Sequence, residues 1–81
     1  MIEQVSLIQK EIMTVEFEVI LNPLAPFTTL LINGENCFIQ DIDTAQVIKA
    51  IMLSTTLNEF QDNIKDIWTA DAINETIQKL N

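Results

Sequence analysis

The spacing of apolar residues changes near residue 43 of this chain: before it they alternate with polar residues, and beyond it they recur every three or four positions. The alternation is clearest between Met13 and Leu21, where a strand would place Met13, Val15, Phe17, Val19 and Leu21 on one side and Thr14, Glu16, Glu18 and Ile20 on the other. Alternation over this length predicts a half-buried strand of an antiparallel sheet.

The only glycine of the chain, Gly34, follows Asn33 between two apolar runs. An Asn-Gly pair in this setting is the strongest short-range hairpin signal, because a type I′ turn needs a positive φ at both central residues. We therefore expect Thr28–Ile32 and Glu35–Gln40 to pair as strands. The preceding segment, Asn22–Pro26, contains both prolines of the chain, which predicts a linker rather than a helix or a central strand.

The N-terminal segment Met1–Glu11 is ambiguous. Apolar residues of this segment and the next follow helical spacing, whereas Val5 and Leu7 alternate as in a strand. We expect a short helix here, with an additional strand as the alternative.

Three helices are expected after the hairpin. Asp43 has the chemistry of an N-cap, with Gln46 at the third helical position, and its helix should run to about Leu53. The apolar stripe of that helix would consist of Val47, Ile48, Ile51 and Met52.

A second capping box, Thr56 with Glu59, predicts a helix over Leu57–Trp68, and Thr69 restarts the chain for a last short helix. The stripes of these two helices would consist of Leu57, Phe60, Ile64 and Ile67, and of Ala70, Ile73, Ile77 and Leu80.

Strands followed by helices indicate the α+β class. We expect a single domain over residues 1–81, with a small antiparallel sheet of about three strands covered on one face by two or three C-terminal helices. The apolar faces of the two layers must meet, so Phe17, Phe38, Phe60 and Ile64 are expected to be buried together.

The charge balance narrows the choice of partners. Twelve acidic residues face only four basic ones, all lysines, which gives a net charge of −8. A bare phosphate backbone would be repelled, so we expect basic protein surfaces rather than nucleic acid as partners. The plainer alternative is that the charge keeps a small apolar protein dissolved. Because 48% of the residues are hydrophobic, more than so short a chain readily hides, we also expect a homodimer.

Residue types needed for common catalytic sites are missing. The chain has no histidine or arginine, a single glycine and a single cysteine, Cys37, so His-based catalysis, phosphate clamps, nucleotide loops and zinc clusters are not expected. We therefore expect no enzyme activity and no cofactor. Glu35, Asp41 and Asp43 are the only carboxylates grouped closely enough to suggest a hard cation, but a helix cap explains Asp43 better.

The same features bear on the compartment. Cys37 is alone and is expected to be a small buried hydrophobic residue in a reducing environment. No apolar run reaches the roughly 18 residues of a membrane helix, and the N-terminal residues lack the basic region of a signal peptide. We expect a cytoplasmic protein without a membrane contact.

Two groups of carboxylates are candidate partner-binding residues. Glu59, Asp62 and Asp66 would share the polar face of the Leu57–Trp68 helix, and Glu16 and Glu18 would share one face of the first clear strand. Each group is either a solvated face or a surface that matches a basic groove on another protein. Trp68, the only tryptophan, is either a residue at the edge of the core or an exposed anchor for a partner.

These features favour a small acidic inhibitor of a nucleic-acid-handling protein, of the anti-CRISPR, antitoxin or immunity-protein type, which occupies a basic surface. The alternative is a homo-oligomeric structural or assembly-chaperone component of a phage or mobile-element complex. The Ile-, Asn- and Thr-rich, arginine-free composition suggests an AT-rich genome, and the small size and acidity are common among phage and mobile-element proteins.

Overall fold

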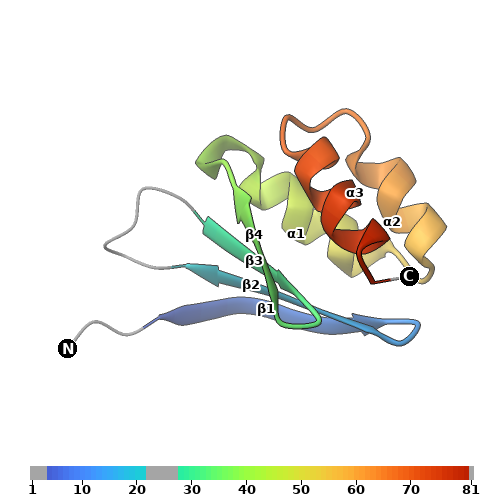
Figure 1. Cartoon of the computed structure of the whole chain (residues 1–81). Coiled ribbons are helices and arrows are strands. Elements are labelled where there is room, and N and C mark those ends of the chain that lie inside the picture. Colours follow the sequence, from blue (N-terminus) through green and yellow to red (C-terminus); the bar gives the residue numbers. More distant parts are fainter. Residues whose placement is uncertain (1–3, 22–27, 81) are drawn as a thin grey trace.

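The described residues of the computed structural model, 4–21 and 28–80, form one four-stranded sheet with a layer of helices on one of its faces (Figure 1). In chain order the elements are β1 (Val5–Ile12), β2 (Val15–Leu21), β3 (Thr28–Ile32), β4 (Glu35–Ile39), the 3₁₀ turn η1 (Asp41–Asp43), α1 (Thr44–Leu53), α2 (Leu57–Ile64) and α3 (Ala70–Gln78). The α+β class is confirmed, with four strands rather than about three. The expected linker Asn22–Pro26 lies outside the described residues.

The sheet is an antiparallel meander in the order β1-β2-β3-β4. The Asn33-Gly34 hairpin is confirmed, with φ values of 50° and 83° at its two central residues. Asn33 also fixes the turn to β2, because its Oδ1 accepts from the backbone N–H of Glu16 and its own N–H donates to the Glu16 carbonyl, both at 2.8 Å. The turn thus joins three strands rather than two.

The short helix expected over Met1–Glu11 is wrong, and the alternative, an additional strand, is what forms: β1 pairs with β2 along Val5–Ile12. The register shifts between Ser6 and Ile8, so the strand alternation is interrupted at Leu7 and is hard to recognise in the sequence. From Ile8 to Ile12, β1 is regularly paired with β2. This pairing with another strand decides the structure of the segment, and the helical spacing of its apolar residues does not reveal it.

Met13 is not part of β2, as the alternation predicted, but begins the two-residue turn that joins β1 to β2, because Ile12 pairs with Val15. Its φ is 58° and its side chain is 64% exposed. Hairpin turns require a positive φ that non-glycine residues seldom adopt, so nothing in the alternation marks this position as a turn.

The helix after the hairpin begins with a different cap from the one expected. Asp43 is only 3% exposed, makes no side-chain cap hydrogen bond, and leaves its Oδ2 without a partner. Because η1 precedes α1, Asp43 has helical φ and ψ values of −94° and −10°, whereas a capping residue normally adopts an extended conformation. Met52, expected in the apolar stripe, is 61% exposed, and Ala50 is buried instead.

The second capping box is confirmed. The Glu59 N–H donates to Thr56 Oγ1 at 3.1 Å, and the Glu59 carboxylate accepts from the hydroxyl of Thr55 at 2.6 Å. However, α2 ends at Ile64 rather than at Trp68. The chain continues through tight turns, in which the N–H of Ile67 donates to the Ile64 carbonyl at 3.0 Å, and these turns bring Ile67 into the core.

The core lies between the sheet and the helices. Phe17 and Phe60 meet there with ring centroids 4.8 Å apart, and Ile64 is fully buried beside the same layer of side chains. Phe38, expected in this group, is 59% exposed. Its neighbours Cys37 and Ile39 point to the helices, so strand alternation turns Phe38 to the other face.

One lysine also connects the two layers. Lys10 of β1 donates through Nζ to the carbonyls of Ile51, Met52 and Ser54 at the C-terminal end of α1, each at 3.0 Å. These carbonyls have no partner within the helix, and the helix dipole makes this end negative, so an ammonium group stabilises it. None of the described helices is long and apolar enough to cross a membrane.

Candidate protein-interaction surface

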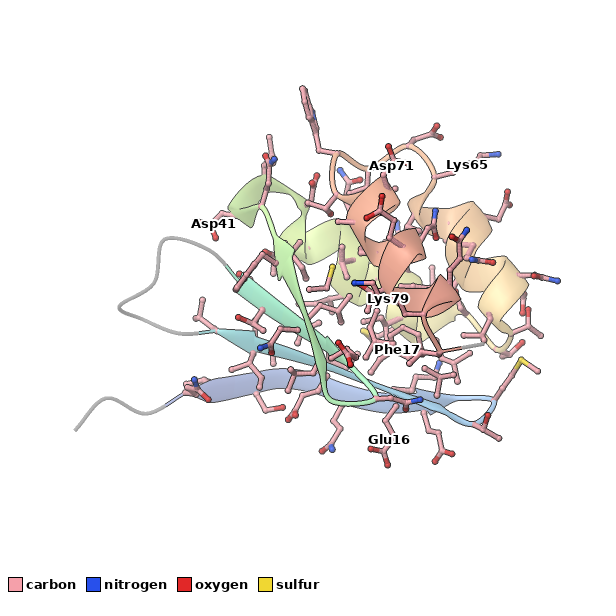
Figure 2. All side chains as sticks on the ribbon, in the orientation of Figure 1. Glu16, Phe17, Asp41, Lys65, Asp71 and Lys79 are labelled. Carbon is pink, nitrogen blue, oxygen red and sulfur yellow. The ribbon has the colours of Figure 1, made fainter. Side chains whose placement is uncertain are left out.

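The helices leave one face of the sheet uncovered, which we call the open face (Figure 1). None of the side chains that the strand register places on it is buried. They are Ser6, Gln9 and Glu11 of β1, Glu16, Glu18 and Ile20 of β2, Thr29 and Leu31 of β3, and Asn36 and Phe38 of β4. Figure 2 shows Glu16 pointing away from the helical layer.

Three carboxylates gather on the open face, and we call Glu11, Glu16 and Glu18 the sheet carboxylates. Glu11 and Glu16 are direct partners in the β1–β2 register, and Glu18 is paired with Gln9. Side chains directly opposite each other in an antiparallel pair have Cβ atoms roughly 4.5–5.5 Å apart, and like charges at that distance destabilise the sheet. None of the lysines in the described strands compensates them, since Lys10 is directed to the helical layer.

Hydrogen bonds order the carboxylate of Glu18 and the backbone of Glu16. The Ser6 hydroxyl donates to Glu18 Oε2 at 2.8 Å across the β1–β2 pair. The backbone of Glu16 is held on its other side by Asn33. Because the Glu18 carboxylate is already held by Ser6, a partner that binds it would lose less conformational entropy in ordering this side chain.

Apolar side chains adjoin the sheet carboxylates. Leu31 is the register partner of Glu18, and Ile20 lies two residues further along β2; both are half-buried. Phe38 continues this apolar strip onto the edge strand β4. The open face therefore combines negative charge with apolar area, a combination that a protein partner can use and that solvation does not require.

The helical carboxylates form no comparable surface. Asp66 lies beyond the end of α2, so the expected stripe of Glu59, Asp62 and Asp66 on one helix is wrong. Asp62 pairs with Lys65 at 3.2 Å. Glu59 belongs to the N-terminal cap of α2, where hydrogen bonds from the Thr55 hydroxyl and N–H lower the pKa of its carboxyl group.

The two groups of carboxylates do not share one face, because α2 belongs to the layer on the opposite side of the sheet from Glu16 (Figures 1 and 2). Glu11 completes the sheet group but was not predicted from the sequence. Its role depended on β1 being a strand. A hairpin with a two-residue turn between Ile12 and Val15 pairs these two residues, and the next pair along the strands is then Glu11 with Glu16.

Trp68 lies at a second surface and is not a residue at the edge of the core, because its side chain is 82% exposed. It lines a groove between the end of β4 and the start of α3, which we call the aromatic groove. Its lining residues are Phe38, Ile39, Gln40, Asp41, Trp68, Thr69 and Ala72. The exposure of Trp68 agrees with the alternative of an anchor for a partner.

The buried thiol of Cys37 offers no reactive group. Burial raises its pKa above the usual value, and a hydrogen bond with Thr76 offsets only part of this effect. Over residues 4–21 and 28–80, no three His, Cys, Asp or Glu side chains gather closely enough to hold a metal ion.

Comparisons with protein-family models, with curated proteins and with solved structures find no match. The open face and the aromatic groove, with their charge, exposure and hydrogen bonds, are the features of the molecule that indicate a function.

Proposed function

We propose that this chain is a small acidic protein-binding module that places its sheet carboxylates on a basic surface of another protein. A groove that normally binds nucleic acid is the surface that such a module would occupy, and occupying it would inhibit the partner. The observation that carries the proposal is the direct cross-strand pairing of Glu11 with Glu16, with Glu18 beside them and no described lysine on the open face.

The energetics of the pair support binding to cations. A like-charge cross-strand pair destabilises a sheet by roughly 0.2–1 kcal/mol, a penalty that lysine or arginine side chains from a partner would remove. Lys10 lies between Gln9 and Glu11 in the sequence of β1, but its ammonium group donates hydrogen bonds to carbonyls at the end of α1, on the other side of the sheet. The open face thus keeps its negative charge unneutralised.

The neighbouring apolar side chains would supply the contact area. Leu31 and Ile20 lie beside the carboxylates, so a partner could bury apolar surface while its cations reach Glu16 and Glu18. The charges would mainly accelerate association, because their field steers the partner, whereas the apolar contact would slow dissociation. Salt should weaken the complex, since exposed charges are screened within about 8–10 Å at physiological ionic strength.

This activity needs neither catalysis nor a cofactor, and it corresponds to the functional class of anti-CRISPR proteins, antitoxins and immunity proteins. The same charges would oppose direct binding to nucleic acid. We place the protein in the cytoplasm, where the single cysteine, Cys37, stays reduced.

The test compares two triple variants as baits in the host lysate. The open-face triple, E11Q/E16Q/E18Q, removes the sheet carboxylates; the control triple, E35Q/D62N/E75Q, removes as many exposed charges elsewhere. The proposal predicts a protein that wild type and the control triple retain and the open-face triple loses. Adding the purified chain should then displace labelled nucleic acid from that protein. Equal retention by both triples, or no displacement, would contradict it.

A second candidate, a homo-oligomeric structural component, is favoured by the outer edge of the sheet. β1 is an edge strand, and its exposed backbone is accompanied by Val5 and Leu7, which are 47% and 42% exposed. Such an edge can pair with a second copy. Light scattering at micromolar concentrations distinguishes the candidates, because a monomer mass throughout would exclude this one.

A further inference from the structure

The aromatic groove is separate from the sheet carboxylates and has its own character. Its lining includes Trp68, in the turn before α3, and Phe38, on the edge strand β4. Ala72 of α3, which has a small side chain, also lines the groove. Tryptophan is one of the residues enriched at the energetic centres of protein interfaces.

Thr69 adds an unsatisfied polar group to the lining of this groove. The residue is only 7% exposed, and its Oγ1 has no hydrogen-bond partner among the described residues. A buried hydroxyl without a partner is unfavourable.

The surroundings of the groove are acidic. Asp41 lines it, and the exposed Asp66 and Asp71 flank Trp68 along the chain. Figure 2 shows Asp41 and Asp71 on the same side of the molecule, at the end away from the sheet carboxylate Glu16. None of the described lysines lines the groove, and Lys65, the closest in sequence to Trp68, is paired with Asp62.

These charges decide between occupants. A second copy in a two-fold contact would bring Asp41, Asp66 and Asp71 against the same residues of its partner, between chains that each carry a net charge of −8. A segment with an apolar centre and basic flanks instead matches both features, since its apolar side chain meets the aromatic rings while its cations meet the aspartates.

We propose that the aromatic groove is a docking site for a short basic segment of a partner protein. An apolar side chain of that segment lies between Phe38 and Trp68, and lysine or arginine residues on either side of it lie near Asp41, Asp66 and Asp71. This site goes beyond the proposed function, because it uses side chains other than the sheet carboxylates and can be tested without them.

Trp68 makes the test direct, because it is the only tryptophan and is 82% exposed in the free protein. The probe is a synthetic peptide with a central leucine pair and lysines on both sides. Two control peptides replace either the leucines by alanine or the lysines by glutamine. The proposal predicts a saturable blue shift of the Trp68 emission with the probe, and an affinity at least about tenfold weaker for each control peptide.

Variants of the protein locate the site. A72K places a cation in the groove at an exposed helical position and should abolish the blue shift while the far-UV circular dichroism stays unchanged. The double variant D41N/D66N should bind the probe peptide more weakly than wild type does, whereas the matched control E35Q/E75Q should bind it with unchanged affinity. The open-face triple should still bind, which separates failure of this proposal from failure of the proposed function.

Three results would overturn the docking proposal. One is a blue shift that persists in A72K. Another is binding of the alanine control peptide as tightly as the probe, which would show charge attraction without an apolar anchor. The third is a Trp68 emission that shifts with protein concentration in the absence of peptide, which would identify a second copy as the occupant.

Discussion

Glu11 and Glu16 lie directly opposite each other on neighbouring antiparallel strands, and no lysine of the described open face stands between them. The strand β1 does carry Lys10, but its ammonium group binds the carbonyl oxygens at the end of α1 instead. The arrangement weakens the sheet slightly and leaves a negative surface. Both consequences can be measured.

The first prediction is that Glu11→Gln stabilises the protein, because it removes the repulsion from Glu16 and keeps the size of the side chain. We expect the free energy of unfolding to rise by roughly 0.2–1 kcal/mol at low salt, measured by urea denaturation, with a smaller gain at high salt. Glu35→Gln, a change of the same kind away from the open face, is the control. A loss of stability in Glu11→Gln would show that the pair is not repulsive.

The second prediction concerns the aromatic residues of the core. Phe60→Ala should lower the free energy of unfolding by about 3–5 kcal/mol, because it removes the ring that packs 4.8 Å from Phe17. Phe38→Ala, which affects a 59% exposed side chain, should cost far less. Equal losses in the two variants would contradict the burial described above.

The third prediction concerns the hairpin turn. A side chain at Gly34 would have space, since nothing lies within 4 Å of an added Cβ, but the φ of +83° is unfavourable for it. Gly34→Val should therefore lower the stability by about 1–3 kcal/mol and reduce the melting temperature. Gly34→Asn should lose less, because asparagine tolerates this conformation better. An unchanged melting temperature in Gly34→Val would show that the positive φ at this position does not penalise a side chain.

The fourth prediction concerns the contact between the two layers. Lys10→Met keeps most of the apolar stem but removes the three hydrogen bonds to α1, and we expect a loss of roughly 1–2 kcal/mol in urea denaturation. Lys49→Met, at an exposed position of α1, should change the stability little. If both variants unfold alike, the bonds of Lys10 to the helix end contribute nothing measurable.

Local signals predicted much of the fold. The Asn33-Gly34 turn and the Thr56–Glu59 capping box each depend on residues close in sequence, and both formed as expected. The Asp43 cap failed because the preceding 3₁₀ turn changes the backbone conformation at that residue. The exposure of Phe38 follows from alternation along β4, once Cys37 and Ile39 are seen to face the helices.

The candidate site depended more on distant contacts. Glu16 and Glu18 could be placed on one outward face from the alternation of β2 alone. The contribution of Glu11 could not, because it requires the pairing of β1 with β2, which the irregularity at Leu7 conceals. Trp68 is exposed because α2 ends at Ile64 and the chain then turns. The packing of that turn against the rest of the protein determines where the helix ends, and the spacing of apolar residues does not show it.

NMR shows directly whether the sheet carboxylates bind cationic partners. Amide chemical shifts of the ¹⁵N-labelled protein would be followed during titration with a nona-arginine peptide, in wild type, the open-face triple and the control triple. We expect shifts concentrated on β1 and β2 around Glu11, Glu16 and Glu18 that decrease with salt, persist in the control triple and vanish in the open-face triple. Shifts confined to α2 and α3, or shifts of equal size in both triples, would contradict this expectation.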